Sequence, residues 1–228
     1  MSPSKQDKLL VSCPHCGQRQ SEPRAAISTI CKKCGGHFLV QEALKPRSKT
    51  IETAPERRRV NCFNCGTELE VAISAESTMC KRCSSYVDLK DYRIASAVSK
   101  NFRTKGSFVV EPKGYVFNTE AVVGEAVIRG RFHGKLVVEG SLTIYSTAEI
   151  KGSFVAGHLI IPAENHFFWN EPLRPDSAEI GGELAANLNT AGTAILKSTA
   201  RLFGNLEATN LVVEAGAVVV GRMRIGVP

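Results

Sequence analysis

From about residue 106 onward, the chain repeats a short pattern in which two apolar positions flank a glycine with one residue between each. The pattern occurs five times, at residues 132–136, 150–154, 180–184, 202–206 and 219–223. Alternate residues of a β-strand share a face, so each unit is expected to place two apolar side chains and a glycine inward. A small inward residue suits a narrow, tightly turned coil.

The spacing of these units defines a repeat. Their central glycines, Gly134, Gly152, Gly182, Gly204 and Gly221, lie 18, 30, 22 and 17 residues apart. The two short intervals predict one winding each, and the two long ones a winding plus an insertion. Short β-rich units that stack on a fixed period predict a parallel β-helix. An antiparallel sandwich is the alternative, but it predicts Asn-Gly or Asp-Gly turns, and neither dipeptide occurs here.

The longest interval contains an insertion, residues 162–177, which carries the only tryptophan of the chain. We expect this loop to fold over the side of the β-helix, with Phe167, Phe168 and Trp169 as a cover. A partner-binding projection is the alternative.

The first 83 residues hold all eight cysteines, as four Cys-x-x-Cys pairs. Two pairs make each module, and the predicted metal ligands are Cys13, Cys16, Cys31, Cys34, Cys62, Cys65, Cys80 and Cys83. Four thiolates suit tetrahedral zinc, and glycine after the second cysteine of a pair suits a left-handed turn. Ser84 takes that glycine's place in the fourth pair, a departure expected to weaken the geometry there without removing a ligand. His15 and His37 are expected to be bystanders.

Both modules, at residues 11–43 and 60–92, resemble the zinc-ribbon family. We expect two structural zinc ions, because neither module buries enough apolar surface to fold without metal. Iron in a rubredoxin-like site is the main competitor. A redox dithiol is disfavoured, since it uses one cysteine pair rather than two matched ones.

Charge is concentrated in the front of the chain. Residues 1–105 hold 19 Lys and Arg against 10 Asp and Glu. This excess can favour nucleic acid, acidic protein or lipid headgroups, and Lys32, Lys33, Lys81 and Arg82 lie at the predicted tips of the cysteine turns. Flexible linkers are expected at residues 44–59 and 93–105, and a solvated linker accounts for much of the charge equally well.

No apolar run approaches the roughly 18–20 residues of a membrane span, and the first residues lack an apolar signal core. The expectation is a cytoplasmic protein, with membrane association unsupported. Paired cysteines in a reducing compartment favour metal over disulfides.

Two stretches, residues 194–221 and 127–140, resemble bactofilins, and the resemblance covers residues 106–228. It implies a right-handed parallel β-helix that polymerises end to end into filaments without nucleotide, as a bacterial cytoskeletal scaffold. The chain departs from the family in having two cysteine modules where bactofilins usually carry a short tail, so membrane attachment is not carried over. Expected partners are other copies of the chain, and proteins bound through the ribbons or loop 162–177.

The final residues, 218–225, are expected to supply one filament contact. The chain as given stops soon after the last unit, which is expected to leave an uncapped apolar end. A monomer whose end is covered by loop 162–177 is the alternative.

Two other function classes compete with the scaffold. Some acyltransferases use left-handed β-helices with six-residue repeats. In this chain a six-residue spacing of glycines is only local and is not sustained along the sequence. His133, His158 and His166 are isolated in sequence from acid partners or nucleophiles, and His133 is expected at the surface, so no enzyme is predicted. The second competitor is a protein that binds nucleic acid through its zinc ribbons and the basic residues of segment 1–105, and that the β-helix multimerises.

Overall fold

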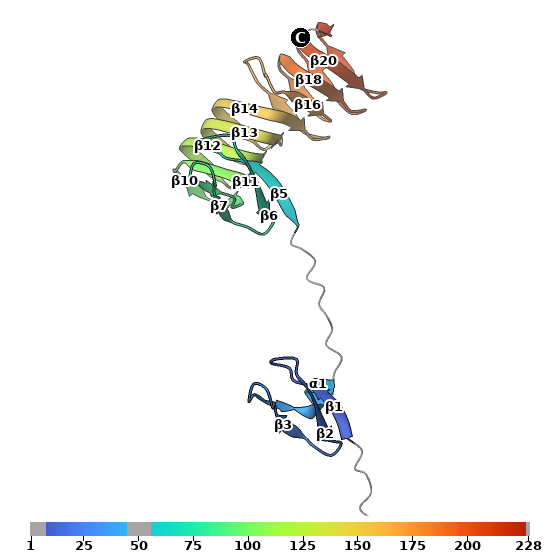
Figure 1. Ribbon diagram of the computed structural model, residues 1–228. Coiled ribbons are helices and arrows are strands. Elements are labelled where there is room, and N and C mark those ends of the chain that lie inside the picture. Colours follow the sequence, from blue (N-terminus) through green and yellow to red (C-terminus); the bar gives the residue numbers. More distant parts are fainter. Residues whose placement is uncertain (1–7, 45–55, 227–228) are drawn as a thin grey trace, which may run out of the picture. The chain divides into compact units, whose positions relative to one another are not determined.

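The computed structural model describes residues 8–44 and 56–226, and divides the chain into two compact units, Met1–Ala54 and Pro55–Pro228. Each unit is described by itself, since their relative placement is not determined (Figure 1). Both are built almost entirely from β-strands. The mainly β fold class, with a solenoid that follows two four-cysteine modules, is therefore confirmed.

The first unit consists of two small hairpins and one short helix. Its elements are β1 (Lys8–Ser12), β2 (Arg19–Pro23), β3 (Ser28–Ile30), β4 (His37–Leu39) and α1 (Val40–Leu44). β1 pairs antiparallel with β2, and β3 with β4. Its buried core contains only Val11, Phe38, Val40 and two cysteines, Cys13 and Cys31. A core of this size is typical of small modules that a metal ion or disulfides stabilise.

The second unit begins with a module of the same design. Its strands are β5 (Arg57–Asn61), β6 (Glu68–Ala72), β7 (Ser77–Met79) and β8 (Tyr86–Asp88), paired as two antiparallel hairpins. Part of the linker expected at residues 44–59 is wrong, because residues 57–59 belong to β5 and Leu44 ends α1. Cross-strand ion pairs from Arg57 and Arg59 to β6 explain why so charged a segment forms a strand. Residues 45–55 lie outside the described residues.

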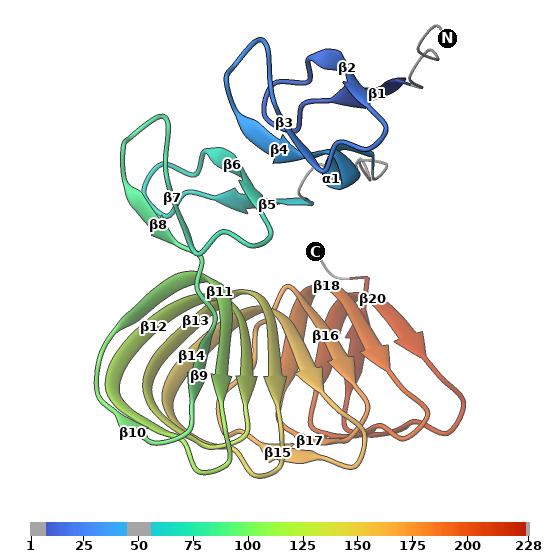
Figure 2. The ribbon, with the colours of Figure 1, turned by 90° about the horizontal axis from the view of Figure 1, so that it is seen from below.

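A parallel β-solenoid makes up the rest of this unit (Figure 2). Its longer strands are β11 (Phe102–Val110), β12 (Tyr115–Ile128), β13 (Arg131–Ile144), β14 (Glu149–Ile161), β18 (Leu188–Leu196) and β20 (Leu206–Val213). Its shorter strands are β9 (Tyr92–Ile94), β10 (Ala97–Val98), β15 (His166–Phe168), β16 (Ser177–Ile180), β17 (Glu183–Ala185), β19 (Arg201–Phe203), β21 (Val218–Val220) and β22 (Met223–Ile225). One sheet runs β22-β20-β18-β16-β14-β13-β12-β11-β9 with β10 beside β12, and a second runs β15-β17-β19-β21.

The linker expected at residues 93–105 is wrong. These residues lie mainly in β9, β10 and the start of β11, and they pair in parallel with the windings that follow. Ile94, Phe102 and Thr104 are buried in the first windings. The lysines and arginines that gave the segment the character of a linker alternate with these inward residues.

The repeat predicted from the glycines sets the register of the solenoid. Phe132 stacks on Ile150 and Leu136 on Phe154, as predicted. The unit at residues 180–184 is out of this register, because Leu184 stacks on Leu202 and Leu188 takes the place beside Leu206, so Gly182 is not the counterpart of Gly204. The glycines have a different role from the one expected. Gly152 has φ 113°, and a Cβ there would lie 2.1 Å from the carbonyl oxygen of Gly134 in the preceding winding. Glycine at this position therefore permits close backbone stacking between successive windings, rather than making room in the core.

The insertion at residues 162–177 forms part of a winding of its own. β15 lies within it and pairs with β17, so the segment is not simply a loop. Phe167 is buried and Trp169 packs against the core, whereas Phe168 is 66% exposed. The expected aromatic cover is therefore formed by Phe167 and Trp169. No helix in the part of the chain that the structure describes is long and apolar enough to cross a bilayer.

Candidate metal centres and assembly surface

Each cysteine module gathers its four sulfurs into one cluster. The members are Cys13, Cys16, Cys31 and Cys34 in the first unit and Cys62, Cys65, Cys80 and Cys83 in the second, with the Sγ atoms of each set within 4.8 Å of one another. The structure thus brings together both sets of residues that the spacing predicts as ligands. Each cluster can hold a metal ion.

The distances between sulfurs distinguish a metal site from disulfides. In the first cluster, Cys13 Sγ lies 3.8 Å from Cys34 Sγ and Cys16 Sγ 3.5 Å from Cys31 Sγ. The matching distances in the second cluster are 3.6 and 3.5 Å. A disulfide requires about 2.0 Å. Tetrahedral zinc–thiolate bonds of about 2.3 Å place neighbouring sulfurs about 3.8 Å apart.

The turn that presents each cysteine pair is built from the backbone. In all four turns, the N–H of the residue after the second cysteine donates to the carbonyl of the first, as from Gly17 to Cys13 at 2.9 Å. Gly17, Gly35 and Gly66 have φ of 67–72°. Ser84 adopts φ 55° and donates to Cys80 at 2.8 Å. The expected weakening of the fourth turn is therefore absent from its backbone geometry.

Hydrogen bonds in the turns favour thiolates. Backbone N–H groups of Cys34 and Lys33 lower the pKa of Cys31 to about 6. The Thr67 hydroxyl, 3.2 Å from Cys65 Sγ, lowers the pKa of that thiol to about 6. Ser85 acts in the same direction on the pKa of Cys83. Burial and the neighbouring thiols outweigh backbone N–H groups at two other cysteines, and raise the pKa of Cys16 to about 12 and that of Cys80 to about 11. Because metals bind the thiolate form, Cys31, Cys65 and Cys83 are the thiols expected to give up their protons most readily.

The two histidines near the first cluster lie outside it. His15 Nε2 is 3.4 Å from the carbonyl oxygen of His37. Among the described residues, neither histidine ring belongs to a cluster of side chains that could hold a metal ion. The donor set of each cluster is therefore sulfur only, which fits zinc and also permits iron.

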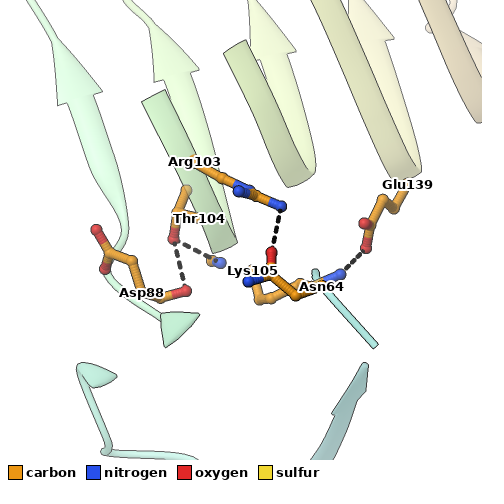
Figure 3. Close-up of polar contacts among 7 residues, drawn as sticks. Asn64, Asp88, Arg103, Thr104, Lys105 and Glu139 are labelled. Atoms are coloured by element: carbon orange, nitrogen blue, oxygen red, sulfur yellow. Dashed lines mark hydrogen bonds and ion pairs between the residues drawn. The ribbon is translucent and has the colours of Figure 1, made fainter. Parts of the chain in front are cut away.

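The second cluster is connected to the solenoid through its own cysteine turn. Phe63 and Asn64 stand between the ligand candidates Cys62 and Cys65. The Phe63 ring centroid lies 4.0 Å from Lys105 Nζ and 4.7 Å from Arg103 Cζ, both on β11. Asn64 Oδ1 accepts a hydrogen bond from Arg103 at 3.2 Å (Figure 3). The turn that presents two sulfurs therefore also contacts the first windings.

The same junction buries a lysine. The Lys105 side chain is only 5% exposed, and its ammonium forms an ion pair with Glu139 of β13 (Figure 3). Beside it, the Thr104 hydroxyl donates to the carbonyl oxygen of Lys90 at 2.8 Å. Arg58 of β5 donates to the carbonyl oxygen of Leu89 at 3.2 Å. Sequence reasoning missed these contacts, because they join residues 14 to 34 positions apart that only the packed windings bring together.

The basic residues divide into two groups. Lys32, Lys33, Lys81 and Arg82 are exposed at the tips of the cysteine turns, as expected, and their side chains form no ion pair within the described residues. Arg57 and Arg59, by contrast, pair with Glu70 at 3.5 Å and Glu68 at 3.2 Å. The densest basic run of the sequence is therefore largely neutralised by its own hairpin.

The solenoid histidines were expected to stand apart from acidic partners, and for His133 this is wrong. Stacking of successive windings places Glu149 3.6 Å from His133 Nε2 and the Tyr115 hydroxyl 3.0 Å from its Nδ1. His133 is also partly buried rather than fully at the surface. His158 Nδ1 lies 2.7 Å from Ser177 Oγ, again between neighbouring windings.

The last windings expose residues that point inward elsewhere in the solenoid. We call them the terminal apolar layer: Leu211, Val213, Val219, Met223 and Ile225. By register, Met223 stacks on Leu206 and Ile225 on Ala208, which are 0% and 2% exposed. Met223 and Ile225 are themselves 54% and 44% exposed, because no described residue stacks on them.

The opposite end of the solenoid is better covered. Phe102 and Ile94 are 3% and 7% exposed there, and the Tyr92 ring packs edge-on against Phe102 with centroids 5.3 Å apart. Lys100 Nζ lies 4.9 Å from the Phe102 ring centroid. The apolar surface of the two ends is therefore unequal, and the larger share lies in the terminal apolar layer.

Comparison with known proteins gives one match. A family model described as "Bactofilin: Polymer-forming cytoskeletal" matches residues 83–168. No curated protein and no solved structure matches the chain. The matched segment runs from the last cysteine through the first windings to β15, whereas the resemblance noted from the sequence covers residues 106–228. The segment at residues 83–168 is therefore similar to bactofilins, a structural cytoskeletal family rather than an enzyme family, and the parallel solenoid fits that similarity.

Proposed function

We propose that this protein is a cytoskeletal scaffold whose solenoid assembles end to end into filaments without a nucleotide. The observation that carries the proposal is the terminal apolar layer, which ends a stacked core with half-exposed Met223 and Ile225. Covering such a layer with a second solenoid is favourable by about 25 cal/mol per Å² of apolar surface removed from water. Stacking also pairs the open strand edges of β21 and β22.

The geometry of the contact follows from symmetry. Two identical ends meet about a two-fold axis, so contact through the terminal apolar layer alone gives a dimer. An open filament needs a second contact, at the end that carries Tyr92 and Phe102. Two different two-fold contacts in alternation produce a filament without polarity.

A charge placed in the terminal apolar layer tests the proposal. Met223→Lys puts an ammonium where a second copy is expected to stack, and because Met223 is already 54% exposed, we expect the monomer fold to tolerate the charge. We expect negative-stain electron microscopy to show long filaments for the native chain and none for the variant. Val220→Lys is the matched control, since Val220 lies in the neighbouring strand β21 on the outward face and is 55% exposed. Long filaments formed equally well by M223K and the native chain would overturn the proposed contact.

Val219 provides an independent variant. It packs against the core from the last winding and is only partly buried, so Val219→Arg is expected to block stacking as well. Circular dichroism and a sizing column must first show that this variant folds. Filaments formed by folded V219R would count against the contact.

We further propose that each cysteine cluster holds one structural zinc ion. The sulfur distances of 3.5–3.8 Å support a tetrahedral ion, and the hydrogen bonds that lower the pKa of Cys31, Cys65 and Cys83 favour the thiolate form at these three ligands. Metal analysis of the purified protein tests this, with two zinc ions per chain expected. A coloured protein with iron in their place would refute the assignment.

The ribbons are proposed to display binding surfaces along the filament. Many copies in a row raise the effective concentration for a partner that binds each copy weakly. A nucleic-acid partner is not favoured, because the family match is to a cytoskeletal family and Arg57 and Arg59 are already paired with glutamates of β6; the exposed cations at the tips of the cysteine turns are the basic residues left for such a partner. Protein partners, together with self-association, are therefore the proposed partners, and the cytoplasm is the proposed location.

A further inference from the structure

One strand edge in the middle of the solenoid has no partner strand among residues 8–44 and 56–226. β14 pairs with β13 along most of its length, but on its other side it pairs with β16 only over residues 158–161. No backbone hydrogen bond joins residues 149–156 to residues 162–175 in the described part of the chain. At this point in Figure 1, between β14 and β16, successive windings are held together by one sheet only.

The open groups can be identified from the other windings. Gly204 N–H donates to the carbonyl oxygen of Val220 at 3.0 Å, and Leu206 N–H to that of Arg222 at 2.9 Å. Gly152 and Phe154 occupy the same two positions of the repeat in β14, where the next winding supplies no acceptor. Their N–H and C=O groups therefore face outward without a strand to bond, which is the arrangement that an extended chain completes.

The chain cannot easily close this edge itself. The segment opposite β14 contains Pro172 and Pro175, which have no N–H to offer to a sheet. This segment is also bonded to the winding that follows, with Leu173 N–H donating to Asn187 at 2.8 Å. Val155 on the open edge is consequently 59% exposed, whereas its register partner Val137 is partly buried.

A pocket of about 180 Å³ lies between the open edge and the proline-containing segment. Its apolar walls include Phe154 and Trp169, whose ring centroids are 4.9 Å apart in an edge-to-face arrangement. The volume suits one large apolar side chain. Glu171 and Arg174 also line it, and neither forms an ion pair among the described residues.

We propose that the open edge of β14 binds an extended peptide segment of a partner protein by strand addition. The backbone of the peptide pairs with Gly152 and Phe154, and one bulky apolar side chain enters the pocket beside Trp169. Oppositely charged side chains of the peptide face Glu171 and Arg174. This site is independent of the terminal apolar layer, so it holds whether or not the chain forms filaments.

The test uses the full chain and a defined probe, the peptide acetyl-Lys-Thr-Val-Phe-Thr-Val-Glu-amide. Trp169 is the only tryptophan, so its fluorescence reports occupation of the pocket. We expect a saturable change in fluorescence, together with slower hydrogen exchange at Gly152 and Phe154 by about tenfold or more. The Leu136 amide, at the equivalent position in a winding that is already paired, is expected to stay unchanged.

Two controls separate strand addition from mere apolar binding. The same peptide with alternate amides N-methylated cannot pair with an edge, and we expect it not to bind. Val155→Lys places a charge on the open edge and is expected to weaken binding about tenfold or more, whereas Val137→Lys on the paired neighbour is not.

Three results would each overturn the proposal. The first is an absence of saturable binding at millimolar peptide. The second is equal binding of the N-methylated peptide. The third is protection of Gly152 and Phe154 that rises with protein concentration in the absence of peptide, since a second copy of the chain then occupies the edge.

Discussion

Replacing Phe63 by leucine tests whether the second cysteine turn stabilises the first windings of the solenoid. Leucine keeps most of the apolar bulk but removes the aromatic face that lies 4.0 Å from Lys105 Nζ and 4.7 Å from Arg103 Cζ. A cation–π contact contributes about 2 kcal/mol when desolvated and about 0.5–1 kcal/mol when exposed. Lys105 is buried and Arg103 is exposed. The sum of the two contacts predicts that the free energy of local opening at this junction falls by about 2–3 kcal/mol.

The assay is hydrogen exchange at the amides of Gly106 and Ser107, whose N–H groups donate hydrogen bonds to Thr104 Oγ1 and to the Asp91 carboxylate at this junction. Exchange there measures the local opening free energy without requiring two-state unfolding of the whole chain. Phe63→Tyr keeps the ring and serves as the control. We expect it to lose far less protection than F63L.

A double-mutant cycle with Lys105→Met isolates the pairwise contact. We expect a coupling of about 1–2 kcal/mol between Phe63 and Lys105, near the value for a desolvated cation over a ring. Because Phe63 stands between two proposed zinc ligands, a chelator is expected to abolish the coupling. A coupling below about 0.3 kcal/mol in the metal-loaded protein would refute the reasoning, because the error of such cycles is of that size.

Three further outcomes follow from the structure. Gly204→Ala places a Cβ 2.2 Å from a carbonyl oxygen of the preceding winding, at a residue whose φ is 141°. We expect urea unfolding to show that the free energy of unfolding falls by at least about 3 kcal/mol. The control Gly226→Ala, which has open space around it, is expected to lower it by only about 1 kcal/mol. Thr67→Val removes the hydroxyl that lowers the pKa of Cys65 to about 6, so protons compete with zinc for this thiolate at a higher pH. We expect zinc release on acidification, followed with a colorimetric chelator, to occur at a higher pH than in the native chain. Thr78→Val, in the same ribbon, is expected to leave the pH of release unchanged. Filaments held by apolar contacts are expected to persist in about 1 M salt, where exposed charges are screened beyond about 3 Å, and their dispersal there, seen by light scattering, would point to an electrostatic contact instead.

The residue pattern was sufficient to predict the solenoid because stacking repeats one local rule. Inward apolar side chains at 132 and 136 recur at 150 and 154, and the structure places them in register. The cysteine clusters could be predicted from the sequence equally well, since two Cys-x-x-Cys turns on small hairpins bring four sulfurs together by local geometry. In both cases the information lies within a short span of sequence.

Composition was misleading where charge and burial alternate along the chain. Residues 93–105 have the composition of a linker, yet Ile94 and Phe102 point inward while their neighbours Arg93 and Arg103 are exposed. The role of the repeated glycines was likewise misassigned, because the carbonyl that excludes a Cβ at Gly152 belongs to the winding before it.

The sequence by itself therefore determined the two cysteine modules, the parallel coil and its period, since each depends on local spacing. Tertiary structure decided the rest. It placed Phe63 against Lys105, brought Glu149 to His133, and left the edge of β14 open where proline-containing residues pair elsewhere. Those features depend on which windings come to lie side by side, and contacts between residues so distant in sequence are fixed only when the whole coil is packed.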